Sequence, residues 1–146
     1  MQKNFNNIGI GIVSLISVLN LMKSISLDKV FLIIPFFTHQ KLLNYLANEN
    51  SNILSIEQLI SHKVDCFSNY DKRYEDNIVL TINSIQYLTD MEYIVLKNGE
   101  LILKKELPFH SKMGKRANKI YKAASNVAKL LEDNSYNLYL SLKVKI

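Results

Sequence analysis

The sequence has little of the residues that mark disulfide-rich, fibrous or disordered proteins. Its 146 residues include one cysteine, four glycines, two prolines and no tryptophan. The single cysteine, Cys66, excludes an internal disulfide framework and a cysteine-rich zinc site. Few glycines and prolines, with 48% apolar residues, exclude collagen-like and disordered chains. The length is that of one domain, so we treat residues 1–146 as a single domain.

The sequence also lacks any recognisable catalytic arrangement. None of its three histidines, His39, His62 and His110, has a carboxylate or cysteine at a metal-ligand spacing such as HExxH or CxxC. Gly9 and Gly11 form only Gly-Ile-Gly, which is not a phosphate-binding loop. We therefore expect no enzyme activity, no catalytic residues, no metal and no cofactor.

Negative charge is scarce in the last quarter of the chain. The formal net charge is +5, and residues 111–146 hold 8 basic and 2 acidic side chains against 10 and 11 in residues 1–110. One predicted helix there carries Lys112, Lys115, Arg116, Lys119 and Lys122. We predict that these five side chains contact nucleic-acid phosphates or an acidic protein surface. The alternative is an ordinary solvated helix face.

A long uncharged stretch lies between Lys3 and Lys23. Asn and Ser residues dilute it and no small-residue cleavage site follows, which argues against a membrane span or signal peptide. At helical spacing one apolar face carries Ile8, Ile12, Leu15, Ile16, Leu19 and Met22. We predict a helix buried almost all round, in a domain core or an interface. A membrane-associated segment is the alternative.

Helix signals dominate residues 30–89. The run Val30–Phe37 fits either a buried strand or a short helix. Thr38 is placed to cap a helix that turns Leu42, Leu43, Leu46 and Ala47 inward, and Ser55 begins a capping box with Gln58. After a turn through Asp65, a longer helix over 68–89 is predicted from the spacing of Tyr74, Ile78, Ile82, Ile85 and Leu88.

Asn98-Gly99 gives the clearest local signal, a two-residue hairpin turn flanked by β-forming residues. The predicted register pairs Ile94 with Leu103 and Leu96 with Leu101, and these four side chains should share a face on the core. Ser111 is placed to cap a last helix that runs to about Glu132. Its inward stripe is Ile120, Ala123, Ala124, Val127, Leu130 and Leu131. The tail after it fits a strand or a short helix.

These elements predict an α+β fold that is mostly helical. Helix, helix, turn, helix and a two-stranded wing is the order of a winged helix-turn-helix, which residues 38–105 would form. Residues 1–34, an apolar helix and apolar run, and residues 111–146, a basic helix and tail, would pack around this core. Acidic neighbours surround Lys72 and Arg73 at the start of the 68–89 helix, so protein binding fits that helix better than base reading.

Several motifs resemble the middle component of the ABC-three-component systems of bacteria. The most specific is VFLIIPFFTH at Val30–His39, where the family favours an apolar stretch, Pro, apolar residues and then His. Further matches are Phe67 and Arg73, Arg116 with the Ala123-Ala124 pair, and a closing motif of Leu138-Tyr139, Leu142 and Val144. The resemblance covers nearly the whole chain.

The resemblance implies a small non-enzymatic subunit between an SMC-like ABC ATPase and a separate effector, often a nuclease. It also implies anti-phage defence in the cytoplasm, as in Lamassu-type systems, where winged-helix accessory subunits bind the heads of SMC ATPases. The surface expected to bind these partners comprises Ile8, Ile12, Leu15, Leu19, Phe36 and Phe37. A winged-helix transcriptional regulator that reads duplex DNA is the alternative function.

Overall fold

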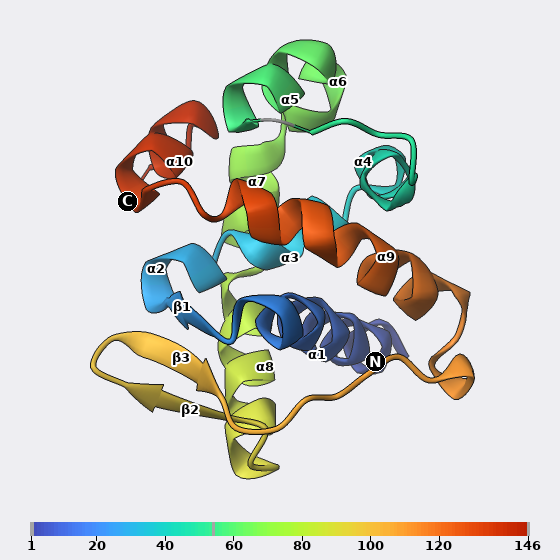
Figure 1. Ribbon diagram of the computed structural model, residues 1–146, viewed down its shortest axis with the longest axis vertical. Helices are drawn as coiled ribbons and strands as arrows, with labels where there is room; N and C mark the ends of the chain where they lie inside the picture. The colour runs from blue at the N-terminus through green and yellow to red at the C-terminus, as the bar shows by residue number, and fades with distance from the viewer. Residues whose placement is uncertain (1, 54, 146) are drawn as a thin grey trace.

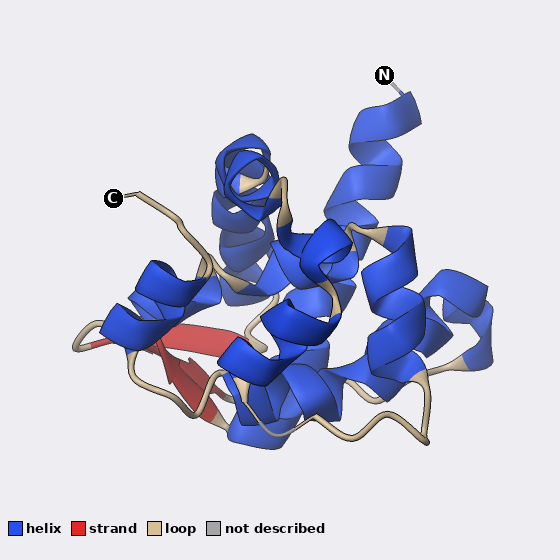
Figure 2. Cartoon of the chain, turned by 90° about the horizontal axis from the view of Figure 1, so that it is seen from above, coloured by secondary structure: helices blue, strands red, loops and turns tan. Residues whose placement is uncertain are grey.

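The computed structural model describes residues 2–53 and 55–145, with side chains from Ile8 onward. Most of this part of the chain is helical, and one small antiparallel sheet lies at an edge of the molecule (Figures 1 and 2). The predicted class, a mostly helical α+β fold, is confirmed. The long first helix, α1 (Gln2–Met22), packs against α8 (Ile78–Asp90) and α9 (Lys115–Leu130) and forms the centre of the fold.

Helix α1 is buried on every side over residues 14–19, beyond which Leu21 is 52% exposed. Leu15, Ile16, Val18 and Leu19 expose none of their surface, and the small side chains of Ser14 and Ser17 are buried as well. Such burial fits a helix that is apolar nearly all round. Within the described residues, the search for a helix with the length and hydropathy of a bilayer span found no candidate.

The apolar run after α1 is helical. It forms α2 (Leu27–Val30) and α3 (Ile33–Phe37), and all five residues of α3 are buried. Pro35 lies in the first turn of α3, where its missing N–H removes no bond within the helix. The run therefore supplies core side chains from a short helix, one of the two predicted alternatives.

Two predicted caps have different outcomes. Ser55 begins α5 (Ile56–His62) as expected, because its Oγ accepts from the backbone N–H of Gln58 at 3.2 Å. Thr38 is not the cap of α4 (Gln40–Ala47): His39 Nδ1 accepts from the N–H of Leu42 at 3.2 Å. Thr38 has the helical backbone angles of the end of α3, whereas His39 has the extended backbone that an N-cap requires.

The predicted turn through Asp65 and the long helix after it both differ from expectation. Residues Val64–Phe67 form the short helix α6, and the long helix is divided at Asn77 into α7 (Tyr70–Asp76) and α8. The side chain of Asn77 donates to the carbonyl of Arg73 at 2.7 Å, which satisfies an oxygen at the break. The face of α8 that is buried carries Thr81, Ser84 and Leu88, while Ile82 faces outward.

The hairpin of β2 (Ile94–Lys97) and β3 (Glu100–Leu103) has the predicted register, with Ile94 opposite Leu103 and Leu96 opposite Leu101. Positive φ angles of 54° and 78° at Asn98 and Gly99 fit the predicted turn. Ile94 and Leu101 are buried and Leu103 is half-buried, but Leu96, opposite Leu101, is exposed, so only part of the predicted face lies on the core.

A third strand, β1 (Ser24–Ser26), pairs with β3, so the strand order is β1-β3-β2. This strand precedes residues 38–105, and the sheet is therefore shared between that range and the N-terminal segment. The winged helix-turn-helix arrangement of 38–105 stays a prediction.

The elements that the structure describes after residue 110 are all helical. Ser111 is not the N-cap of the last helix: it is the first residue of a 3-10 turn, η1 (Ser111–Met113), which His110 caps, and Gly114 is the N-cap of α9. The predicted inward stripe of α9 is buried at every position. The tail forms α10 (Ser135–Ser141), a short helix whose cap, Asn134, accepts from the N–H of Asn137 at 2.8 Å.

Candidate interaction surfaces

The basic face predicted from the sequence lies on η1 and the first half of α9. Lys112, Lys115, Arg116 and Lys122 are exposed, and the half-buried Lys119 donates to Asn44 Oδ1 at 2.8 Å. Within the described residues, none of these five side chains has a carboxylate partner at ion-pair distance. The first turn of α9 holds no acidic residue, so nothing there offsets the positive helix end. Contact of this face with phosphates or an acidic protein surface stays a prediction, as does the alternative of a solvated helix face.

The residues predicted to bind protein partners are divided between the core and the surface. Leu15, Leu19, Phe36 and Phe37 expose none of their surface, and the ring of Phe36 packs edge-on against Tyr70 with centroids 5.3 Å apart. In this fold those four side chains stabilise the chain itself and offer a partner no area. Ile8 and Ile12 are half-buried, so only these two of the six present surface.

An apolar surface that sequence reasoning missed lies on the outer face of α8. Val79 is 67% exposed and Ile82 50%, and Tyr87 and the adjoining Met91 also face outward. No basic residue occurs in Ile78–Asp90. The sequence did contain a sign of this surface, because α8 has more aliphatic residues than a single buried stripe along a helix requires. Exposed Asn83, Gln86 and Asp90 lie on the same outer face. A face with exposed aliphatic side chains and an acidic group suits contact with protein better than contact with nucleic acid.

Arg73 has an internal role. Its Nε donates to the carbonyl of Pro35 at 3.2 Å and its Nη2 to the carbonyl of Cys66 at 3.0 Å, which ties α7 to α3 and α6. Burial lowers the pKa of Arg73 from its ordinary value. Lys72 beside it is exposed.

The histidines and the cysteine lie at helix ends or in the core. His39 and His110 are N-caps, and His62 is the last residue of α5. Cys66 is fully buried, and burial raises the pKa of its thiol. Among the residues that the structure describes, the search for clusters of three or more His, Cys, Asp or Glu able to hold a metal ion found none.

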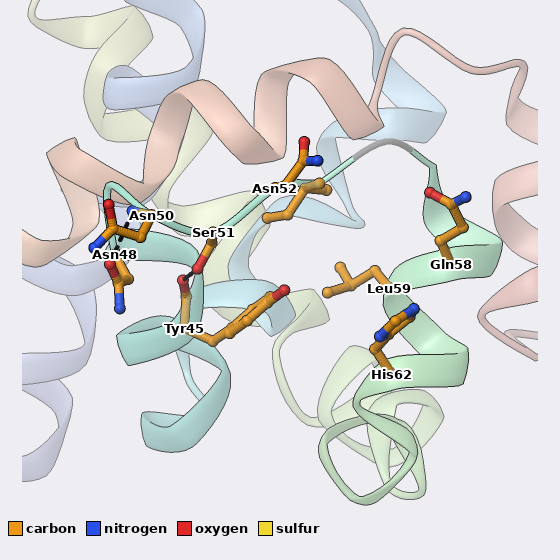
Figure 3. A pocket seen from close by; sticks show the side chains of 9 residues that line it. Tyr45, Asn48, Asn50, Ser51, Asn52, Gln58, Leu59 and His62 are labelled. Carbon is orange, nitrogen blue, oxygen red and sulfur yellow. Dashed lines mark hydrogen bonds between the residues drawn. The ribbon is translucent and has the colours of Figure 1, made fainter.

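A polar pocket of about 470 Å³ lies between the end of α4 and α5 (Figure 3). Tyr45 extends from α4 toward Leu59 and His62 of α5, and the loop that closes the other side is held by Ser51, whose hydroxyl donates to the carbonyl of Tyr45 at 2.6 Å. From the sequence, residues 48–52 were predicted only to form a loop. The lining of the pocket is rich in side-chain amides and uncharged, which suits neutral hydrogen-bonding groups.

The fold thus presents two chemically distinct surfaces, one basic and one with exposed apolar side chains. Residues 20–146 match the family model of the ABC-three component (ABC-3C) system Middle Component 3, and the chain belongs to that family. The predicted resemblance to a middle component is therefore confirmed. The search of curated proteins gave no match, and neither did the search of solved structures.

Proposed function

We propose that this chain is a non-enzymatic adaptor that links an SMC-like ABC ATPase to an effector nuclease in a bacterial, cytoplasmic anti-phage complex of the Lamassu type. Its family description supports a place among three components. An adaptor needs exposed surface for more than one contact. The basic face of α9 and the apolar face of α8 supply two chemically distinct surfaces.

The apolar face of α8 is the observation that carries this proposal. Val79 and Ile82 leave 67% and 50% of their surface in water, although buried positions are more favourable for such side chains. Exposed apolar patches on soluble proteins mark contact sites for other proteins. We assign this face to the ABC ATPase.

The basic face supports a second contact, with the phosphates of DNA held by the complex. Lys112, Lys115, Arg116, Lys119 and Lys122 lie on one side of η1 and α9. Phosphate contacts position a protein without reading sequence. A transcriptional regulator would need a base-reading helix, and α8 has no basic residue while the guanidinium of Arg73 bonds to backbone carbonyls.

Co-purification with the ABC ATPase of the same system tests the adaptor role. The tagged wild-type chain should retain the ATPase through gel filtration. Ile82→Glu should weaken retention at least tenfold, because a carboxylate would be desolvated in an apolar contact. Tyr136→Glu, at a side chain of α10 that is 77% exposed, is the matched control and should retain the ATPase. A wild-type chain that elutes as a monomer without the ATPase would contradict the proposal.

Binding of a random-sequence duplex at increasing salt tests the DNA contact. Log affinity falls linearly with log salt concentration, and the magnitude of this slope should be smaller by roughly 1 in Lys115→Ala, because one phosphate contact is lost. Lys129→Ala, elsewhere on α9, should leave the slope unchanged. A strong preference for one duplex sequence would favour the regulator instead.

A further inference from the structure

Two adjoining surface cavities share the lining residues Ile10 and Arg116, and the two together are called the groove. The first, of about 330 Å³, is lined on its polar side by Thr38, Arg73, Asp76, Asn77 and Arg116. The second, of about 310 Å³, has an apolar lining that includes Ile10, Val13, Met113 and Ile120. The groove runs between α1, the α7–α8 junction and the start of α9. One half is polar and the other is apolar.

The polar half favours an acidic group. Arg73 and Arg116 bring two guanidinium groups to it from different helices, against the single carboxylate of Asp76. Among the described residues, neither arginine has a carboxylate at ion-pair distance. Arg73 already donates from Nε and Nη2 to backbone carbonyls, so Arg116 supplies the more exposed guanidinium of the two.

The apolar half has room for a side chain. Ile10 and Val13 of α1 and Ile120 of α9 form its aliphatic walls. A Cβ added to Gly9, which also lines it, would meet no atom within 4 Å. A DNA backbone carries charge but no aliphatic group for such a cavity. The pairing of an apolar cavity with two arginines therefore favours a protein segment over nucleic acid.

We infer that this groove binds a short segment of a partner protein in which an Asp or Glu adjoins a large aliphatic residue. The carboxylate lies between Arg73 and Arg116, and the aliphatic side chain fills the cavity beside Gly9. The exposed ammonium groups of Lys112 and Lys115, on the adjoining turn and helix end, add attraction for further acidic residues. Only the assignment of this segment to another component of the system rests on the proposed function.

Fluorescence anisotropy with labelled synthetic peptides tests the inference on the full chain. The probe is a twelve-residue peptide of Asp and Leu, with one control that has Ser for Leu and another that has Lys for Asp. The Asp–Leu peptide should bind at least tenfold more tightly than either control, because it alone has both groups. Equal binding of the Asp–Ser peptide would overturn the inference, since the apolar half would then contribute nothing.

Two pairs of variants locate the binding site. Arg116→Glu should weaken binding of the Asp–Leu peptide about tenfold to a hundredfold, the range for a charged hydrogen bond. Lys129→Glu makes the same charge change on the same helix and should bind like the wild type. Gly9→Phe should block the apolar half, whereas Gly9→Ala should not, because a methyl group leaves the cavity open. Thermal melting of each variant confirms that it is folded.

Competition with a random-sequence duplex separates the two macromolecular ligands. If Gly9→Phe weakens duplex binding as much as peptide binding, the groove is a nucleic-acid site and the inference is wrong. Equal losses in Arg116→Glu and Lys129→Glu would also overturn it, since they would reflect net charge alone. The ABC ATPase is absent from every peptide measurement, so failed co-purification and failed peptide binding are separate results.

Discussion

At the residue scale, the backbone of Leu107 fixes where the basic helix begins. Asn20 on α1 donates to the Leu107 carbonyl at 2.9 Å and accepts from its N–H at 3.1 Å. Tyr121 on α9 donates to the same carbonyl at 2.5 Å. The link between the hairpin and α9 is thereby bonded to both helices that line the groove. These polar side chains position surfaces that they do not themselves form.

Tyr121 gives the fold a dependence on alkaline pH. Burial raises the pKa of Tyr121 from its ordinary value of 10.0 to about 12. The unfolded chain therefore loses this proton at lower pH than the folded chain does. Stability from Tyr121 is fully present below pH 10 and is lost as the pH rises to about 12.

Tyr121→Phe should cost about 1 kcal/mol in the free energy of unfolding at neutral pH, because one hydrogen bond is lost. It should also make the loss of stability between pH 10 and about 12 shallower. Urea unfolding followed by circular dichroism at several pH values measures both effects. Tyr136→Phe, at an exposed side chain, should leave the neutral-pH stability unchanged. An unaltered alkaline decline in Tyr121→Phe would contradict the assignment.

At the element scale, the crossing of α1 and α8 depends on small residues. A Cβ on Gly11 would lie 2.1 Å from Ser84 Oγ and 3.1 Å from Leu80 Cδ1. Ser84 in turn donates to the carbonyl of Leu80 at 2.7 Å, so its hydroxyl cannot rotate away without losing that bond. Close approach at Gly11 explains why α8 buries Thr81 and Ser84 and turns Ile82 outward.

Gly11→Ala should lower the free energy of unfolding by about 1–3 kcal/mol through overpacking against α8. Gly9→Ala, two residues earlier on the same helix, should raise it by about 0.5–1 kcal/mol, because alanine favours a helix and its Cβ meets no atom within 4 Å. Chemical unfolding of the two variants gives the comparison. A stabilising Gly11→Ala would show that the helices are farther apart than described.

Elements that depend on neighbouring residues were predictable, and those that depend on distant ones were not. The hairpin register follows from Asn98-Gly99 and the Ser55 cap from its own backbone position. The break at Asn77 and the outward side of Ile82 depend on how α8 meets α1. Strand β1 has three residues and forms only because β3 is beside it, so no local pattern marks it.

At the scale of the whole molecule, charge was easier to predict than contact area. The basic side chains of α9 fall outside its buried stripe, so helical spacing was enough to place Lys115, Arg116 and Lys122 on the surface, with Lys119 half-buried. Leu15, Leu19, Phe36 and Phe37 were expected at a partner interface, but the chain's own helices cover them. Sequence identifies apolar residues without saying what covers them. The groove around Arg116 was beyond local reasoning because it joins three separate segments.

The shared core also decides whether residues 38–105 fold alone. Strand β3 lies between β2 and β1, with Leu101 opposite Ile25, which is outside that range. Helix α8 packs on α1, and α4 packs on α9. A fragment of residues 38–105 would therefore expose Leu42, Leu88 and Leu101, all of which are buried in the whole chain.

We expect this fragment to show no cooperative thermal transition, because the apolar area it would have to bury has no covering elements. The full chain should unfold in one cooperative step, since α1 packs on α3, α8, α9 and the sheet. Calorimetry and circular dichroism of both proteins make the comparison. A fragment that melts cooperatively would establish 38–105 as an independent winged-helix domain. The basic face would then belong to a segment added around this range, and the groove to its boundary, since Arg73 and Asp76 lie inside the range and Ile10 and Arg116 outside it. A fragment that fails to fold makes both surfaces inseparable from the core.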